Sequence, residues 1–297
     1  MNKLFIFALI FPLAFCSKTS SKPTYVYTHN AERYLVRTEM MNGLANGRII
    51  IYGLANEIKV TMHVKDSVLT GKSYSFYDDG NISRITNYVQ GLEQGRRYDF
   101  YKNNQIASII TYKDDKKTGP AYTFYSNGGI EARVNFLNDQ AFGDFLDFYE
   151  KPKNHLRRRV QYNIVRGKQY GNGRIDYSPD GVITKRIGQL DFLFDKKIYS
   201  TKDSIIVAIR LIGPRFKRIR ATLADFDAGF NCNDSTTERI FYGRNHIVQI
   251  VVHPKSRGLN CVRGYITDYD SISPLKEGVL YQIKEKNIYF QQKYLVK

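Results

Sequence analysis

The feature that most constrains the fold of this chain is an internal repeat marked by glycine. The first four spacings between these glycines are 24 residues, and the six positions are Gly47, Gly71, Gly95, Gly119, Gly143 and Gly171. A unit of this length forms one supersecondary element, which is too small to bury a core by itself. The sequence therefore predicts a domain built from stacked units.

Each unit has the pattern of two short strands separated by turns. In the third unit, Tyr98 and Phe100 are two residues apart, so they lie on one face of an extended strand. A polar turn cluster follows, and Ile106 begins a second strand. Short aromatic and β-branched segments between turns indicate strands and not a helix. We expect the rings of Phe100 and Phe124 to lie in a core shared by neighbouring hairpins.

The unit resembles the MORN-like repeat, in the variant form of bacterial antitoxin-like proteins. The consensus sequence of that repeat is roughly G-x-x-x-x-(Phe/Tyr)-Tyr-x-x-Gly-x-(Ile/Leu). The residues that carry the resemblance are Phe76-Tyr77, Phe100-Tyr101, Phe124-Tyr125 and Phe148-Tyr149, with Gly80 and Gly128 at the turns. The match covers about residues 43–187, but Asn104 replaces one turn glycine and an insertion at 151–159 lengthens the fifth unit. The resemblance implies an all-β fold, with an antiparallel sheet of about six β-hairpin units over residues 25–188. It also implies a role as an interaction scaffold, or as an antitoxin-like protein that neutralises a toxin.

The second aromatic residue of each pair gives the repeat domain a candidate binding face. These residues are Tyr77, Tyr101 and Tyr125, and each points away from the Phe before it. Tyrosine offers a large ring and a polar group, which suits an interface. Packing of the rings on one another is the alternative explanation, and it needs no partner.

The first sixteen residues carry a targeting signal. Lys3 precedes an apolar run from Leu4 to Phe15, which is too short to cross a bilayer as a helix but suits the core of a signal peptide. The run ends at Cys16 and resembles a bacterial lipoprotein signal, although Phe15 stands where a small residue is usual. We expect residues 1–16 to be a signal sequence ending at a lipidated Cys16, and residues 17–24 to be a flexible tether. A plain signal peptide is the alternative. A lipid at Cys16 predicts anchoring in the bacterial cell envelope, at the outer membrane, facing the periplasm or the surface.

The formal net charge of +17 indicates an acidic partner. For an exported protein, an anionic envelope polymer or another protein is a better candidate than nucleic acid, and we expect no nucleic-acid partner. Positive charge is concentrated in the fifth unit, where Arg side chains can hold phosphate or carboxylate through paired hydrogen bonds. The candidate residues are Arg157, Arg158, Arg159, Arg166 and Lys168. A solvated basic surface is the alternative.

The 24-residue rhythm ends near Leu190, and we expect a second domain over residues 189–297. Its short apolar runs alternate with Gly, Pro, Asn and Ser, which is typical of a β-sandwich, immunoglobulin-like in outline. Cys232 and Cys261 are expected to form a disulfide in an oxidising compartment. An oxygen-rich stretch from Asp225 to Asp234 could hold calcium, but an ordinary polar loop explains the same residues.

Sequence signatures of enzymes are missing: there is no HExxH, P-loop, GxSxG or CxxC motif. We therefore expect no catalytic residues, no metal ion and no cofactor. The predicted function is that of a membrane-anchored envelope lipoprotein, a non-catalytic binding scaffold for a protein or an anionic envelope polymer. Two alternatives stay open: an antitoxin-like protein, and an enzyme acting on envelope glycans, whose carboxylates need only meet in space.

Overall fold

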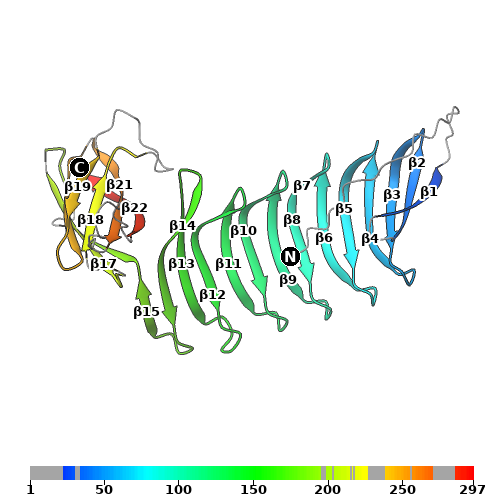
Figure 1. The fold of residues 1–297 in the computed structure, drawn as a ribbon, viewed down its shortest axis with the longest axis horizontal. Coiled ribbons are helices and arrows are strands. Elements are labelled where there is room, and N and C mark those ends of the chain that lie inside the picture. The colour runs from blue at the N-terminus through cyan, green and yellow to red at the C-terminus, as the bar shows by residue number, and fades with distance from the viewer. Residues whose placement is uncertain are drawn as a thin grey trace, which may run out of the picture. The chain divides into compact units, whose positions relative to one another are not determined.

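Every element of the described structure is a β-strand, as the repeat pattern predicts (Figure 1). The structure is a computed structural model that describes residues 23–30, 34–194, 199–202, 204–214, 216, 218–226, 238–254, 256–269 and 285–297. The predicted lipidation at Cys16 and the predicted disulfide partner Cys232 lie outside these residues. The all-β fold class and the array of antiparallel hairpins are confirmed.

The strands fall into a hairpin-repeat part and a C-terminal part. The repeat strands are β1 (Thr24–His29), β2 (Leu35–Met41), β3 (Leu44–Tyr52), β4 (Ile58–Lys65), β5 (Val68–Phe76), β6 (Ile82–Val89), β7 (Leu92–Glu93), β8 (Gly95–Phe100), β9 (Ile106–Lys113), β10 (Lys116–Phe124), β11 (Ile130–Leu137), β12 (Gln140–Phe148), β13 (Leu156–Val165), β14 (Lys168–Tyr177) and β15 (Ile183–Ile187). The C-terminal strands are β16 (Gln189–Phe194), β17 (Ile205–Ile212), β18 (Arg218–Leu223), β19 (Arg239–Tyr242), β20 (Ile247–Val252), β21 (Gly258–Tyr269) and β22 (Glu285–Val296).

The chain forms two compact units. The first comprises Met1–Glu131 with Phe136–Asp139, and the second comprises Ala132–Asn135 with Gln140–Lys297. In the first unit the strands pair in the order β1-β2-β3-β4-β5-β6-β8-β9-β10, and β7 also pairs with β6. In the second unit β12-β13-β14-β15 pair in chain order, and the C-terminal strands follow. The described pairs of repeat strands are antiparallel neighbours along the chain, which is what a two-strand repeat unit requires.

Two-residue turns with positive φ at both positions close six of the hairpins. They are Asn42-Gly43, Asp66-Ser67, Gln90-Gly91, Asp114-Asp115, Asn138-Asp139 and Arg166-Gly167. Such turns match the right-handed twist of the flanking strands. They also join neighbouring repeats: Asp115 N donates to Glu93 O at 3.2 Å, and Glu93 N donates to Asp115 Oδ1 at 2.6 Å. The polar turn residues therefore link one repeat to the next.

The repeating glycine has a local structural cause. Gly119 has a φ of +81° and lies where the pairing of β10 with β9 shifts register, between Lys117 and Ala121. A bulge of this kind requires a left-handed residue, which glycine adopts without a steric penalty. Gly95 has the same φ of +81° and stands opposite Tyr112 across the strands. The 24-residue glycine period therefore marks a bend in each unit.

Between residues 66 and 128, all of which are described, the sheet buries few side chains. Ser73, Thr86, Tyr112 and Ala121 are the four that are buried. Strand pairing places all four on one face, which we call the polar face. The opposite face carries ten half-buried apolar side chains, which we call the aromatic stripe. The stripe consists of Tyr74, Phe76, Ile82, Ile85, Tyr98, Phe100, Ile106, Ile109, Tyr122 and Phe124.

The expectation that Phe100 and Phe124 occupy a shared core is wrong, because both are only half-buried. A single sheet layer has no second layer to cover a face, so rings shield one another only in part. The ring centroids of Tyr122 and Phe124 are 6.5 Å apart with an interplanar angle of 26°. Within the first unit, the buried apolar cluster lies instead on β2 to β4, around Val36, Ile49 and Met62.

The C-terminal strands form a β-sandwich. One sheet has the order β16-β17-β20 and the other has the order β19-β18-β21-β22. Ile205, Ile209 and Ile250 of the first sheet and Ile266 of the second are 0% exposed and belong to one cluster. Because the chain passes from one sheet to the other three times, neither sheet is formed by consecutive strands alone. The immunoglobulin-like outline stays a prediction.

In the second unit, the β13–β14 hairpin packs against the sandwich. Val165 of β13 and Phe226, which follows β18, are buried there together. Tyr289 of β22 lies between two rings, with centroid distances of 5.1 Å to Tyr170 and 5.5 Å to Tyr265. This aromatic cluster joins the two kinds of sheet within the unit.

Candidate functional site

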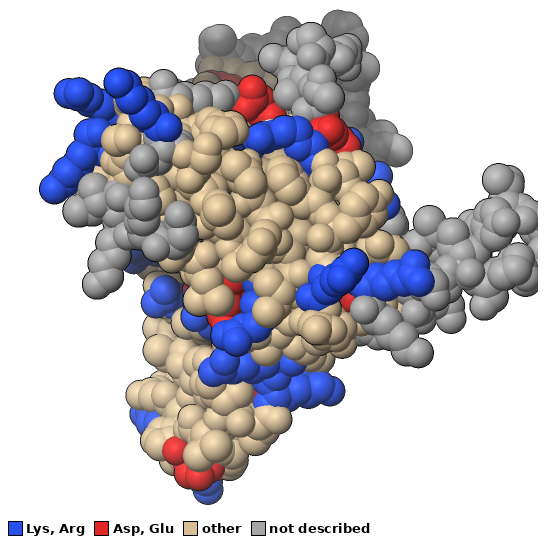
Figure 2. Space-filling view, turned by 90° about the vertical axis from the view of Figure 1, so that its left-hand side faces the viewer, with Lys and Arg blue, Asp and Glu red and all other residues tan. Residues whose placement is uncertain are grey.

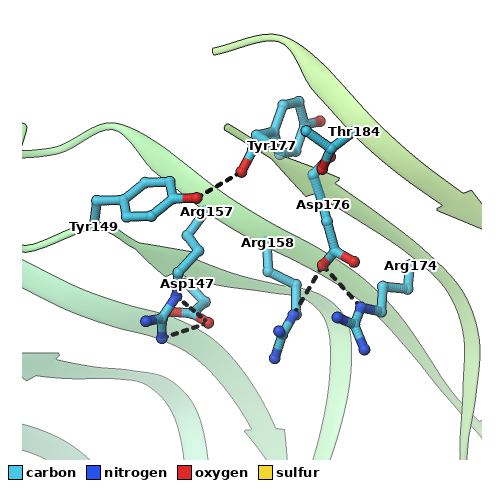
Figure 3. Close-up of polar contacts among 8 residues, drawn as sticks. All are labelled: Asp147, Tyr149, Arg157, Arg158, Arg174, Asp176, Tyr177 and Thr184. Carbon is cyan, nitrogen blue, oxygen red and sulfur yellow. Dashed lines mark hydrogen bonds and ion pairs between the residues drawn. The ribbon is translucent and has the colours of Figure 1, made fainter. Parts of the chain in front are cut away.

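The arginine-rich hairpin begins with a charge pair between Arg157 and Asp147 (Figure 3). Asp147 is buried on β12, and Arg157 Nη2 lies 2.7 Å from its Oδ1. Arg157 Nε also donates to Oδ2 at 3.1 Å, so the guanidinium holds the carboxylate with two nitrogens. A buried carboxylate needs such a partner, because an unpaired charge is costly to desolvate. The first of the predicted anion-binding arginines is therefore engaged within the sheet.

A second charge cluster lies beside the first. Asp176 Oδ1 accepts hydrogen bonds from Arg158 Nε at 3.0 Å and from Arg174 Nε at 2.8 Å (Figure 3). Arg158 stands opposite both Asp147 and Asp176 across the strands. Burial raises the pKa of Asp176, but the hydrogen bonds from Arg174 and Arg158 outweigh it, so the pKa lies below its usual value. Arg158 is thus also paired inside the protein.

The five predicted anion-binding residues do not form one patch. Arg159 follows Arg158 in β13 and so faces the other side of the sheet, where its Nη2 lies 2.8 Å from Asp144 Oδ2. The hydrogen bond with Asp144 raises the pKa of Arg159. Arg166 and Lys168 lie at the β13–β14 turn. Arg166 is nine residues along the chain from Arg157, or about 30 Å away along an extended strand. The structure therefore divides the set among three places.

The arginines and carboxylates that pair across β12, β13 and β14 leave little net charge. Four guanidinium groups, those of Arg157, Arg158, Arg159 and Arg174, face three carboxylates, which leaves one net positive charge. Figure 2 faces the side of the C-terminal strands, where Lys and Arg side chains form separate groups around a surface of uncharged residues. An anionic polymer gains most from a continuous basic surface. Binding of an anionic partner at Arg157 to Arg159 stays a prediction, but these contacts weaken its basis.

The polar face of the repeats has a charge network that the sequence did not reveal. Asp99 lies at its centre, with Arg84 Nε 2.5 Å from Oδ1 and Ser108 Oγ donating to Oδ2 at 2.7 Å. Arg97 lies 3.6 Å from both Asp99 and Glu93. Arg84, Asp99 and Ser108 stand opposite one another on β6, β8 and β9. The alternation of side chains along a strand can be predicted from the sequence. Which residues stand opposite one another on neighbouring strands could be seen only in the structure.

Partial burial changes the acidity of two groups in this network. Burial raises the pKa of Tyr112 to about 12, although the charge of Arg97 opposes this shift. The Arg97 guanidinium carbon lies 4.7 Å from the centre of the Tyr112 ring, in a cation–π contact. Burial likewise raises the pKa of Glu93. These contacts favour a structural network, since each charged group faces an opposite charge or a ring.

The tyrosines predicted to form a binding face hold neighbouring repeats together. Tyr77 Oη donates to Phe100 O at 2.6 Å, and Tyr101 Oη donates to Phe124 O at 2.6 Å. Tyr149 makes the equivalent bond to Tyr177 O at 2.8 Å (Figure 3). Each bond spans one repeat. Tyr125 is half-buried, and its main chain closes the turn at Gly128 and Gly129. Contact of Tyr77, Tyr101 and Tyr125 with a partner stays a prediction.

The stripe tyrosines differ from these linking tyrosines. Tyr74, Tyr98 and Tyr122 are half-buried on the aromatic stripe. Within the described part of the chain, their hydroxyl groups have no hydrogen-bond partner. The sequence pattern predicted that these aromatic residues lie on one face of the strands. It also predicted that this face belongs to a buried core. The structure instead leaves the rings half-buried and the hydroxyls without a hydrogen-bond partner among the described residues.

A comparison with protein families identifies this part of the chain. The MORN repeat variant matches residues 69–90 and 93–114, which cover most of β5 to β9. Residues 69–114 are MORN-like repeats. The predicted resemblance is confirmed there. The parts of the aromatic stripe and of the polar face on β5 to β9 are the two surfaces of these MORN-like repeats. No curated protein matches the chain.

Other predicted sites remain without a test. Cys261 is a half-buried free thiol in the structure, and the disulfide with Cys232 stays a prediction. Of the oxygen-rich stretch, Asp227 to Asp234 lies outside the described residues. Among the residues that the structure describes, no cluster of His, Cys, Asp and Glu suits a metal ion. No helix in that same part of the chain is long and apolar enough to span a membrane.

Proposed function

We propose that the protein is a non-catalytic binding scaffold of the bacterial cell envelope, held at a membrane by a lipid on Cys16. The observation that carries the proposal is the uncovered aromatic stripe of the MORN-like repeats. Ten apolar side chains lie only half-buried on one face of β5, β6, β8, β9 and β10. Soluble proteins rarely leave a contiguous apolar surface open unless it contacts a partner.

The architecture supports binding over an extended surface. A single layer of paired strands offers a face and no deep cavity between layers, and each further repeat enlarges that face. The charged residues support the same proposal, because Asp99, Asp147 and Asp176 are each held by arginine side chains of the same sheet. Carboxylates that act as acids or bases need access to a substrate, which such pairing restricts.

The proposed localisation at a membrane rests on the sequence of the first sixteen residues. An apolar run followed by Cys16 suits a lipoprotein signal. Replacement of Cys16 by Ser in cells should abolish fatty-acid labelling and release the protein from the membrane fraction. Unchanged labelling would exclude lipidation at this residue.

Sedimentation of the purified full-length protein with isolated envelope tests the scaffold function. Membranes and cell-wall sacculi are prepared separately and mixed with increasing protein. We expect saturable retention on one of the two fractions, with the retained material chemically unchanged. Retention should be equal for the Cys16→Ser variant, which lacks the proposed lipid. Release of soluble glycan fragments during the incubation would contradict the non-catalytic assignment. Absence of retention on both fractions would contradict the scaffold function itself.

A further inference from the structure

We propose that the aromatic stripe is a binding track for a linear glycan of β-1,4-linked pyranose units. This inference rests on the proposed scaffold function and names the partner that the scaffold holds. The basis is the order in which the stripe side chains lie across the sheet.

One row of the stripe runs perpendicular to the strands and alternates between tyrosine and isoleucine. Cross-strand pairing joins Tyr74 to Ile85, Ile85 to Tyr98, Tyr98 to Ile109 and Ile109 to Tyr122. Because each repeat contributes two strands, a tyrosine recurs at every second strand. Neighbouring strands lie about 4.8 Å apart, so the tyrosines recur about every 9.6 Å.

This interval fits the chemistry of a β-1,4-linked glycan. In an extended chain of this linkage, successive sugars are turned over, so every second sugar presents the same face. The length of one disaccharide unit is close to the spacing of the tyrosines. A chain lying along the row therefore presents equivalent apolar sugar faces to Tyr74, Tyr98 and Tyr122 in turn. Polarised sugar C–H groups contact the negative face of an aromatic ring favourably.

The side chains around this row supply the remaining recognition groups. The hydroxyls of Tyr74, Tyr98 and Tyr122 have no hydrogen-bond partner within the described residues, so they are available to sugar hydroxyls. Lys72 and Arg96 are exposed two residues before Tyr74 and Tyr98 and hence lie on the same face. They place hydrogen-bond donors along one flank of the row, within reach of ring substituents such as acyl oxygens or carboxylates.

The opposite face of the same strands differs in burial and in charge. Tyr88 and Tyr112 recur there at the same 24-residue interval, but Tyr112 is buried and its ring lies under the Arg97 guanidinium. The buried positions of this face are the small or hydrogen-bonding residues Ser73, Thr86 and Ala121, together with Tyr112. Its charged groups are paired around Asp99. Its half-buried Tyr88 stands opposite Gly71 and belongs to no tyrosine row of the stripe. Tyr88 therefore provides a matched control on the same strands.

Titration of the full-length protein with defined oligosaccharides tests the track. The ligand is the hexamer of β-1,4-linked N-acetylglucosamine, which can reach three tyrosines, and the control ligand is the hexamer of α-1,4-linked glucose. Calorimetry measures the dissociation constant. We expect binding of the β-linked hexamer, with an affinity at least about ten-fold above that of its dimer and of the α-linked hexamer. Binding should persist at high salt, since it does not depend on exposed charge pairs.

Variants place the binding on the stripe. The triple variant Tyr74→Ala, Tyr98→Ala and Tyr122→Ala should weaken hexamer binding by at least about ten-fold, whereas Tyr88→Ala should leave it within about two-fold. A thermal melt shows whether each variant is folded. Footprinting of the wild-type protein provides a second measurement that needs no variant. The hexamer should protect Tyr98 from modification and leave Tyr88 unchanged.

The outcomes separate the track from the scaffold. Equal loss of binding in the triple variant and in Tyr88→Ala, or equal protection of both faces, would overturn the stripe as the site. If the wild-type protein sediments with an envelope fraction but does not bind the β-linked hexamer, the glycan track is wrong and the scaffold function stands. If the wild-type protein is retained by neither envelope fraction, the scaffold function itself is wrong, whatever the result with the hexamer.

Discussion

The side chain of Asn172 pairs with the main chain of Tyr289 in both directions. Tyr289 N donates to Asn172 Oδ1 at 3.2 Å, and Asn172 Nδ2 donates to Tyr289 O at 2.5 Å. Tyr289 belongs to β22, an edge strand of the four-stranded sheet, and Asn172 of β14 is 2% exposed. The amide thus takes the place that a further strand would occupy at this point of the edge. Lys286 Nζ also donates to Asn172 O at 3.3 Å.

Replacement of Asn172 by Ala should destabilise the second unit. It removes both hydrogen bonds between Asn172 and the main chain of Tyr289, so the free energy of unfolding should fall by about 2 kcal/mol. Chemical denaturation measures the loss. Asn163→Ala is the control, because Asn163 is half-buried and makes one longer bond to Tyr289 O, at 3.3 Å. A loss no larger in Asn172→Ala than in Asn163→Ala would show that the paired amide is not a stabilising contact.

The repeat fold could be predicted from the sequence because its signals are local. The glycine spacing, the aromatic pairs and the polar turn clusters each act within one unit, and the structure gives each a local cause, such as the bulge at Gly119. The depth at which side chains lie was not predictable in this way. Phe100 and Phe124 have the spacing of core residues, but burial depends on a second layer that a local pattern does not specify.

The candidate site was predictable only in part. The Arg-rich segment was visible in the sequence, but its partners Asp144 and Asp176 lie on other strands and are brought near by the sheet. The number of arginines in the segment therefore overstated its unpaired positive charge, because each of Arg157, Arg158 and Arg159 faces a carboxylate. The stripe tyrosine Tyr98 was visible as a same-face aromatic, but its open hydroxyl depends on contacts between repeats that only the structure shows.

Replacement of Tyr101 by Phe should weaken the link between two repeats. The change removes the 2.6 Å hydrogen bond to Phe124 O, so we expect a loss of about 1 kcal/mol in unfolding free energy. Tyr98→Phe is the matched control, because it removes a hydroxyl that has no partner within the described residues, and it should be nearly neutral. Urea denaturation of both variants provides the comparison. Equal stability of the two variants would contradict the linking role of Tyr101.

Substitution of Gly119 by Ala should cost stability through backbone strain alone. Gly119 has a φ of +81°, and a Cβ added there would meet nothing within 4 Å. The expected loss of unfolding free energy is about 1 to 2 kcal/mol, which is the cost of holding an L-residue in the left-handed region. Gly119→Asn should lose less, since Asn tolerates this conformation. The order of the two melting temperatures tests the argument, and a more stable Ala variant would refute it.

The charge cluster at Asp176 should make stability depend on pH in a predictable direction. Burial alone would raise the pKa of Asp176. The hydrogen bonds from Arg174 and Arg158 lower the pKa by more than burial raises it, so the pKa in the folded protein lies below the ordinary 3.8. A carboxyl group with a lowered folded pKa stabilises the native state above its unfolded pKa. That contribution is lost as the pH falls through the folded value.

The variant Asp176→Asn should therefore unfold more easily than the wild type at pH 7, by about 1 kcal/mol, because the partner arginines are partly exposed and solvent screens the pair. The difference should shrink as the pH is lowered below about 4, the ordinary range of an Asp carboxyl. Denaturant midpoints measured over this range test the direction. In an Arg174→Gln background the pH-dependent part should be smaller, since one of the two donors to Asp176 is gone. A difference that stays constant with pH would show that Asp176 stabilises the hairpin by packing and not by its charge.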